Sequence, residues 1–185
     1  MVRPKPWVKF TVKEYMTTPD DKRYQLLDGE MILAPSPTAR HQAIAGNLFT
    51  YIRQFVTERT LGRVWFAPLD VILSNHDVAQ PDILFVSNSR ASIVTDANIQ
   101  GAPDLVVEIL SPATVGYDRG YKQLLYSRHG VREYWLVDPD GETVEILSEG
   151  NQGLAATATY HRGEVLASPV LEGMALELDQ VFSRD

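Results

Sequence analysis

A carboxylate interrupts an apolar stretch in the middle of the sequence. Within DLVVEILSP, residues 104–112, Glu108 is the one charged side chain between five apolar residues: Leu105, Val106, Val107, Ile109 and Leu110. Such a run is typical of a strand covered on both faces. An isolated ionised carboxylate is costly there, so Glu108 needs a cation, a metal ion or a proton. An arginine paired with Glu108 at the end of the strand is the simplest alternative.

A second carboxylate opens the neighbouring apolar segment. Asp82 follows Pro81 in QPDILFV, and the dipeptide Pro-Asp alone is a common turn feature. If the two strands are neighbours, Asp82 and Glu108 lie within reach of one divalent cation. Hard cations such as Mg²⁺ take few protein carboxylates and keep several waters. The pair therefore predicts a metal site, with a simple turn as the alternative for Asp82.

A lysine follows on a predicted helix. Asp118, Lys122 and Tyr126 are spaced by four residues and so form a stripe on a helix, at the boundary between core and solvent. The stripe flanks an expected apolar face made by Tyr121, Leu124 and Leu125. An ordinary surface ion pair between Asp118 and Lys122 is the alternative to a role in chemistry.

Apolar spacing and turn residues predict the elements that hold these side chains. Asp28-Gly29 within Tyr24–Leu33 indicates a hairpin. Helical spacing predicts a long helix from Ala39 to Thr60, with Thr38 near its cap and Gly62 as its stop.

The rest of the chain is richer in strands. Strands are expected at 63–73, 80–87, 103–111, 132–139 and 143–150, a turn at 74–79, a loop or short helix at 88–101, a helix at 118–129, and a C-terminal hairpin over 155–171 with its turn at Arg162-Gly163. This order predicts an α/β or α+β fold with a mixed central sheet flanked by helices.

Composition limits the class of protein. The chain has 185 residues, 44% of them hydrophobic, no cysteine and a net charge of -7. We expect one globular domain over 1–185, with an N-terminal arm at 1–20 and a C-terminal β extension at 150–185. Absent cysteines exclude disulfides and thiolate zinc sites and favour a cytoplasmic location. The first ten residues lack the apolar core of a signal peptide, and no apolar run is long enough for a membrane span. The negative net charge disfavours non-specific coating of DNA.

In their order along the chain, these segments resemble a known superfamily. A Pro-Asp, then an apolar strand with a glutamate, then a lysine resembles the PD-(D/E)XK nucleases. The stretches LLDGEMILAPSPTARHQAI, QPDILFVS, GAPDLVVEILSPAT and DRGYKQLLYSRHGVREYWLVDP resemble more closely the Uma-type family of restriction endonucleases. The resemblance covers about Tyr24 to Pro139. The superfamily pattern has lysine two residues after the glutamate, where this chain has Leu110, so the resemblance assigns that role to Lys122.

The resemblance implies a restriction-endonuclease-like core and a metal-dependent endonuclease acting on DNA more readily than on RNA. Asp82, Glu108 and the carbonyl of Ile109 would hold Mg²⁺ or Mn²⁺, and Lys122 would orient water or stabilise the phosphate. The resemblance also implies two further site residues. They are Glu30, as an additional acidic group, and His41, in the first turn of the long helix. A helix N-terminus disfavours positive charge, so we expect His41 to be a neutral imidazole that orients a phosphate, a water or a carboxylate.

Family members often act as homodimers, because a duplex has two strands to cut, and the apolar C-terminal segments could support self-association. Arg40, Arg53, Arg119 and Arg128 are candidate phosphate contacts. Two other functions remain open at this point. One is a catalytically inactive restriction-endonuclease-like fold used for binding or assembly. The other is a serine hydrolase using Ser111, which the absence of a G-x-S-x-G elbow disfavours.

Overall fold

The computed structural model describes residues 9–19 and 23–183, and its centre is a six-stranded sheet. The strands follow the order β11-β10-β9-β8-β6-β3, and only β8 and β9 run parallel. Their bounds are β3 Gly62–Phe66, β6 Ile83–Ser87, β8 Leu105–Ile109, β9 Glu133–Asp138, β10 Thr143–Gly150 and β11 Gly153–His161. The sheet is mixed, as predicted.

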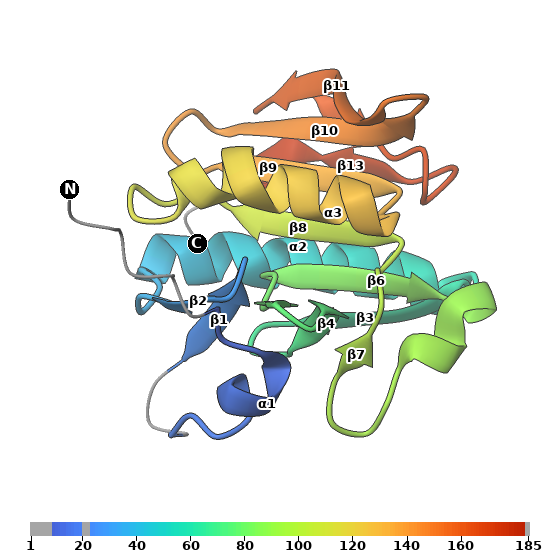
Figure 1. Ribbon diagram of the computed structural model, residues 1–185. Coiled ribbons are helices and arrows are strands. Elements are labelled where there is room, and N and C mark those ends of the chain that lie inside the picture. The colour runs from blue at the N-terminus through green and yellow to red at the C-terminus, as the bar shows by residue number, and fades with distance from the viewer. Residues whose placement is uncertain (1–8, 20–22, 184–185) are drawn as a thin grey trace.

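Two smaller sheets complete the strands. A five-stranded sheet has the order β2-β1-β5-β4-β7, and a two-stranded sheet joins β12 to β13. Their bounds are β1 Tyr24–Leu27, β2 Glu30–Leu33, β4 Val71–Ser74, β5 Asp77–Ala79, β7 Ile99–Gln100, β12 Val165–Ala167 and β13 Ala175–Glu177. Figure 1 shows the five-stranded sheet below the main sheet, with the N-terminal helix beside it.

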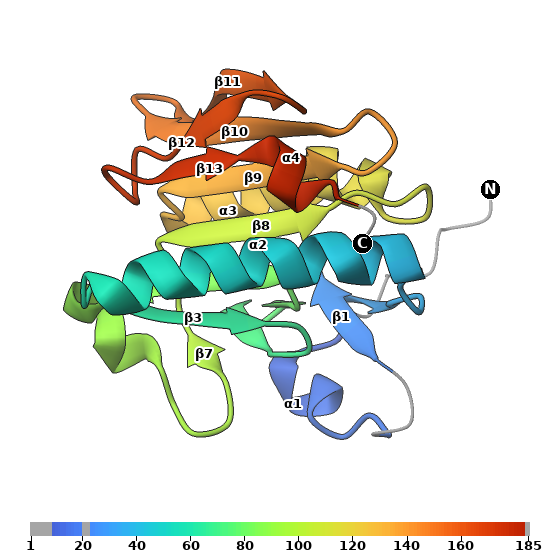
Figure 2. The ribbon, with the colours of Figure 1, turned by 180° about the vertical axis from the view of Figure 1, so that it is seen from behind.

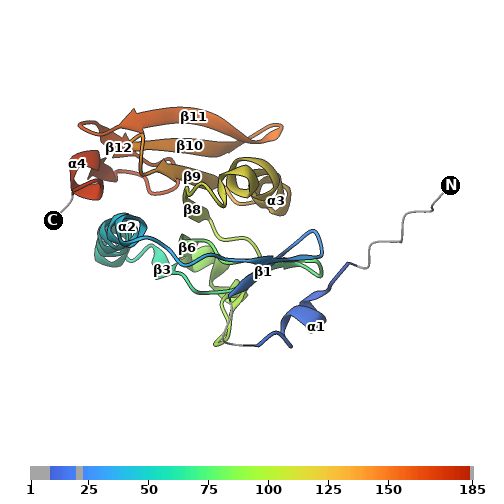
Figure 3. The same ribbon diagram turned by 90° about the vertical axis from the view of Figure 1, so that its left-hand side faces the viewer.

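Helices cover both faces of the main sheet. They are α1 Val12–Tyr15, α2 Ala39–Glu58, the 3₁₀ helix η1 Asn88–Ile93, the π-helix η2 Tyr117–Lys122, α3 Gln123–His129 and α4 Leu178–Val181. α3 lies in front of the sheet in Figure 1, and α2 lies in front when the molecule is seen from behind in Figure 2. Figure 3 shows the resulting layers edge-on, with α2 and α3 on opposite sides of β8 and β9.

Alternation along β8 divides the core between these two faces. Leu105, Val107 and Ile109 pack with the buried residues of α2, whereas Val106 and Leu110 pack on the other side with Tyr126 of α3. Because side chains alternate along a strand, Glu108 shares the α3 side with Val106 and Leu110.

The predicted long helix and first hairpin are confirmed. Thr38 accepts a hydrogen bond from the His41 amide at 3.1 Å, and α2 buries Ile44, Leu48 and Ile52. Asp28 and Gly29 both have positive φ, 51° and 77°, as a two-residue hairpin turn of type I′ requires.

Three local predictions are wrong. Residues 63–73 are not one strand: β3 and β4 belong to different sheets, because Pro68 supplies no backbone N–H for a ladder. Residues 74–79 are not all turn, since β5 pairs with β1 through Val78. The chain turns at Arg162-Gly163 as predicted, but the strands on either side of that turn do not pair with each other as a hairpin. β11 pairs with β10 instead, and β12 leaves to pair with β13, which buries Leu166 and Leu176 against α2.

The predicted N-terminal arm lies partly outside the described residues, which omit 1–8 and 20–22, so the signal-peptide prediction there stays a prediction. Within the arm, α1 packs on β1 through Tyr15, whose hydroxyl donates to the carbonyl of Tyr24. In the described ranges, no helix combines the length and the apolar character needed to cross a membrane.

A buried carboxylate fastens the two-stranded sheet to β9. Glu133 is 0% exposed and accepts hydrogen bonds from the Trp135 indole, the Ser168 hydroxyl and the Val170 amide. Burial raises its pKa above the ordinary 4.5, although these hydrogen bonds act to lower it. Protons therefore bind Glu133 more tightly in the folded state. Its contribution to stability is fully present below pH 4.5 and is lost as the pH rises through the folded pKa.

We predict that Glu133→Gln flattens the pH dependence of stability. The unfolding free energy of the wild type, measured by urea denaturation, should fall relative to that of the variant as the pH rises above 4.5 through the raised pKa of Glu133. Glu177→Gln, on an exposed position of β13, controls for the loss of one carboxylate. Parallel pH profiles for wild type and Glu133→Gln would contradict the prediction.

Candidate active site

A cavity of about 700 Å³ opens at one end of the main sheet. The start of β6, the end of β8, the end of β9, the first turn of α2 and the helix η2 all reach it. Its lining includes five of the six residues that the sequence singled out: His41, Asp82, Glu108, Ile109 and Lys122.

Strand register brings the two carboxylates together. β6 and β8 are antiparallel and pair Ile83 with Val107, so the next position along the ladder sets Asp82 opposite Glu108. Asp82 is fixed further by the amide of Ile109, which donates to its Oδ2 at 2.7 Å. The two acidic groups thus stand on adjacent, rigid strands and line one cavity.

A lysine and a tyrosine hold Glu108 inside the fold. Lys122 Nζ donates to Glu108 Oε1 at 2.9 Å, and the Tyr126 hydroxyl donates to the same oxygen at 2.8 Å. Asp118 Oδ1 lies 3.0 Å from Lys122 Nζ on its other side. Lys122 is only 2% exposed and Glu108 4%, so this ion pair is buried.

The helix that carries Lys122 differs from the prediction. Its first part, Tyr117–Lys122, is a π-helix, and the α-helix begins only at Gln123. π-Helical turns have i→i+5 hydrogen bonds and shift the side chains that follow relative to an α-helix. The stripe Asp118–Lys122–Tyr126 is consequently buried instead of lying at a boundary, and Leu124 is 61% exposed instead of facing the core.

Burial and charge set the protonation of this cluster. Burial raises the pKa of Glu108 to about 8; Lys122 opposes the shift, while Asp118 and Asp82 add to it. Burial lowers the pKa of Lys122, but the two carboxylates beside it outweigh that effect and the pKa is raised. The ammonium of Lys122 is therefore the persistent charge of this cluster, while burial works against the ionised form of Glu108 and the ammonium works for it.

His41 contacts the other carboxylate. Its Nε2 lies 3.2 Å from Asp82 Oδ2. Orienting a carboxylate is one of the three roles expected for this imidazole. The expected neutral state is not what its surroundings favour. Burial lowers the pKa of His41, but the hydrogen bond and charge of Asp82 prevail and raise it. The nearby carboxylate outweighs the unfavourable helix N-terminus.

Glu30 is the sequence-predicted residue that the structure does not bring to the cavity. It is exposed at the turn end of β2, paired with Leu27, whereas the opposite end of the hairpin contributes Gln25 and Ala34 to the lining. Ser111 does line the cavity, but its hydroxyl is hydrogen-bonded to Thr114 and not to a histidine, so the geometry gives no support for a serine hydrolase.

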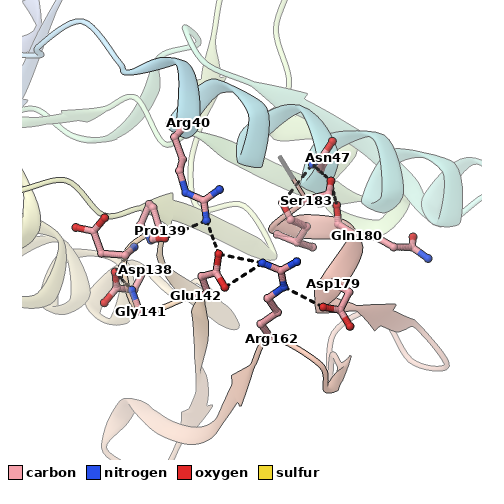
Figure 4. Close-up of polar contacts among 12 residues, drawn as sticks. Arg40, Asn47, Asp138, Pro139, Gly141, Glu142, Arg162, Asp179, Gln180 and Ser183 are labelled. Atoms are coloured by element: carbon pink, nitrogen blue, oxygen red, sulfur yellow. Dashed lines mark hydrogen bonds and ion pairs between the residues drawn. The ribbon is translucent and has the colours of Figure 1, made fainter. Parts of the chain in front are cut away.

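Arg40 is a second positively charged side chain, held at the rim of the cavity by an ion pair. Arg40 Nη2 donates to Glu142 Oε1 at 2.7 Å and to the Pro139 carbonyl at 3.3 Å. Glu142 also binds Arg162, which continues to Asp179 of α4, and Figure 4 shows this chain of charges below the first turn of α2. Of the candidate phosphate contacts, Arg40 and Arg119 line the cavity, while Arg53 is exposed on α2.

The donor atoms at the cavity suit a hard cation. Within residues 9–19 and 23–183, no group of three or more His, Cys, Asp and Glu side chains could hold a metal ion. In the same ranges, Asp82 Oδ1 and Glu108 Oε2 have no hydrogen-bond partner, while the second oxygen of each carboxylate is engaged. Two carboxylate oxygens and several waters are a set that Mg²⁺ accepts. Thiolate or histidine-rich zinc sites are not formed here.

Sequence reasoning placed Asp118 and Tyr126 with Lys122 on one stripe at the boundary between core and solvent but gave those two residues no role in the site, and it did not single out Gln25. The spacing of Asp118, Lys122 and Tyr126 was a usable signal, because three polar residues on one stripe suggest a shared environment. Gln25 carried no such signal within its strand.

Comparison with known proteins agrees with this geometry. The model of the family Uma2, described as "Putative restriction endonuclease", matches residues 12–179. An uncharacterized protein of Synechocystis sp., slr1290, is 24% identical over 183 residues, which cover 96% of this chain and 93% of the relative. A crystal structure from Anabaena variabilis, described as a "putative nuclease belonging to DUF820", superimposes with a TM-score of 0.77 at 24% identity, over 94% of this chain and 97% of that one. This likeness confirms the predicted fold.

We predict that the buried ion pair of Lys122 is far more important for stability than the exposed pair nearby. Lys122→Met leaves Glu108 and Asp118 buried without their cation and should lower the unfolding free energy by about 3–5 kcal/mol. Arg119→Met, in the same π-helix, removes an arginine that is 45% exposed and pairs with Glu145, and should cost at most about 1 kcal/mol. Urea denaturation measures both, and equal losses would contradict the prediction.

Proposed function

The chain belongs to the Uma2 family, and on that premise we propose that it is a metal-dependent nuclease that hydrolyses phosphodiester bonds in DNA. The observation that carries the proposal is the buried ion pair of Glu108 and Lys122, set opposite Asp82 in one cavity. A structural core has little use for this arrangement, because buried ion pairs rarely add stability over apolar residues. A catalytic site, in contrast, needs fixed charges at the place where a phosphate reacts.

Asp82, Glu108 and the carbonyl of Ile109 would hold Mg²⁺ or Mn²⁺. When bound, such an ion lowers the pKa of a coordinated water and offsets negative charge on a phosphodiester. The ionised form of Glu108 is the one that ligates a metal, so a bound cation would oppose the effect of burial on its pKa.

Lys122 supplies the permanent positive charge of the site. An ammonium has three N–H donors. One is hydrogen-bonded to Glu108 Oε1, and Asp118 Oδ1 lies 3.0 Å away as an ion-pair partner. A further N–H would be available to a phosphate oxygen or to the attacking water. Tyr126 and Asp118 act as positioning residues, because they fix the carboxylate and the ammonium without lying between them and the cavity.

His41 and the rim arginines have supporting roles. His41 contacts Asp82 Oδ2, and within the described residues Asp82 Oδ1 has no hydrogen-bond partner. Arg40 and Arg119 lie where neighbouring phosphates of the substrate would pass, and guanidinium groups bind phosphates in a bidentate manner.

We predict that Asp82→Asn, Glu108→Gln and Lys122→Met each lower the rate of DNA cleavage by at least about a hundredfold, because each removes a charge at the reacting phosphate. Supercoiled and linear DNA with Mn²⁺ or Mg²⁺ are suitable substrates, and EDTA should abolish cleavage. Glu58→Gln, an exposed carboxylate on α2, is the matched control. Asp82→Asn is the most direct test, because Asp82 is 19% exposed and its replacement disturbs the core least.

Absence of cleavage by the wild type, or equal rates for all variants, would overturn this function. Calorimetry with Mn²⁺ then separates the alternatives, since an inactive binding module has no reason to bind the ion through Asp82 and Glu108.

We further propose that the nuclease is a cytoplasmic homodimer, since two copies are the simplest way to cut both strands of a duplex. Sedimentation velocity should give a mass of twice 20.7 kDa, and a monomer at micromolar concentration would contradict this prediction.

A further inference from the structure

We propose that a second, smaller pocket beside the cavity binds the nucleobase next to the scissile phosphate. The inference rests on the proposed nuclease function and names the substrate group that this site takes. The pocket has a volume of about 140 Å³ and lies between the β1–β2 hairpin and the segment that leads into η2. It shares Gln25 and Lys122 with the cavity, so the two spaces meet at the proposed catalytic lysine.

The walls of this base pocket, defined by Leu27, Ile32, Leu33, Ala113 and Tyr117, are apolar. Leu33 is 54% exposed and Tyr117 is 39% exposed, so both side chains present apolar surface to solvent at this pocket. A flat aromatic ring and an aliphatic side chain are the groups that stack on a nucleobase, because every base presents a π-face.

Charge also favours a neutral ring as the occupant. Among the described residues that line the base pocket, Lys122 is the only charged one. A phosphate or carboxylate in this pocket would contact one cation, Lys122, and otherwise apolar surface, so an anion fits the pocket poorly. A base fits this distribution, with its phosphate at Lys122 and its ring against Tyr117.

Gln25 offers a hydrogen bond inside the base pocket. It is 7% exposed, and its Oε1 accepts the amide of Gln80 at 3.2 Å. In the part of the chain that the structure describes, its Nε2 has no hydrogen-bond partner. A buried amide donor of this kind suits the carbonyl oxygens and ring nitrogens at the edge of a base.

A base can enter such a pocket only after it leaves the stack. Single strands provide unstacked bases directly, whereas a duplex must extrude one at a cost that is lower at a mismatch. The shared chemistry is an unstacked nucleobase, and the choice of substrates in the test distinguishes the two sources.

Binding, measured without metal so that nothing is cleaved, tests the base pocket. Tyr117→Ala should weaken the Kd for a short fluorescent single strand on the order of tenfold in anisotropy titrations, and Leu33→Ala should weaken it in the same direction. Leu124→Ala, 61% exposed and outside both pockets, is the matched control and should bind as the wild type does. For a strand of equal length that lacks bases, Tyr117→Ala should bind with the same Kd as the wild type.

Duplexes identify the source of the base. Tighter binding of a mismatched than of a matched duplex, lost in Tyr117→Ala, indicates extrusion; dependence on Tyr117 for single strands alone indicates an unpaired substrate. Either result supports the base pocket. The inference is overturned if Tyr117→Ala and Leu33→Ala bind the normal single strand with the Kd of the wild type. It is also overturned if both variants lose as much affinity for the strand without bases as for the normal strand. Because the readout is binding, a wild type that binds through Tyr117 but cuts no DNA would refute the nuclease and leave the base pocket standing.

Discussion

The ion pair of Lys122 and Glu108 is the interaction around which this end of the molecule is organised. Two carboxylates and one ammonium are nearly excluded from water there. Glu108 accepts hydrogen bonds from Lys122 and Tyr126, and Asp118 Oδ1 lies 3.0 Å from the same ammonium. Desolvation makes such a cluster intolerant of change, because loss of one member leaves a buried charge without a partner. Several elements must therefore keep a fixed relation: β8 supplies Glu108, η2 supplies Asp118 and Lys122, and α3 supplies Tyr126.

The same constraint explains why Glu108 stands on a central strand. The strand is covered by α2 on one face and α3 on the other, so its backbone is held by neighbours on both edges and both faces. A carboxylate placed there has little freedom to move. Its partner Asp82 lies directly opposite through the β6–β8 register. Rigid support of this kind is what a precise polar site needs, since small displacements of reacting groups are costly.

Sequence patterns predicted those parts of the fold that depend on local chemistry. The Asp28-Gly29 turn, the Thr38 cap and the apolar spacing of α2 depend on residues close together in the chain, and all three are confirmed. Pro68 marks a break within 63–73, but the sheet that each half joins could not be predicted, because it depends on which distant strands offer an edge. Pairing of β12 with β13 has the same origin.

For the site, the sequence indicated which residues are present but not how deeply they lie. Composition alone cannot distinguish a surface i,i+4 pair from a buried one, and the π-helical turn that buries Asp118 and Lys122 has no evident sequence signature. The prediction for Glu30 is wrong for a geometric reason. Glu30 lies at the turn end of its hairpin, whereas the opposite end lines the cavity.

Charge at the cavity rim bears on how an acidic protein would bind the polyanionic substrate that we propose. The net charge of -7 repels nucleic acid at a distance, and both rim arginines are already paired, Arg40 with Glu142 and Arg119 with Glu145. Ion pairs that water reaches contribute little to stability, so exchange of a glutamate for a phosphate costs little. Lys122 differs from them because its carboxylates are buried with it and cannot be exchanged for solvent. Substrate can thus replace partners at the rim while the charge at the centre stays fixed. Under the proposed function, the rim arginines would admit the backbone of the substrate and the buried lysine would define where the phosphate stops.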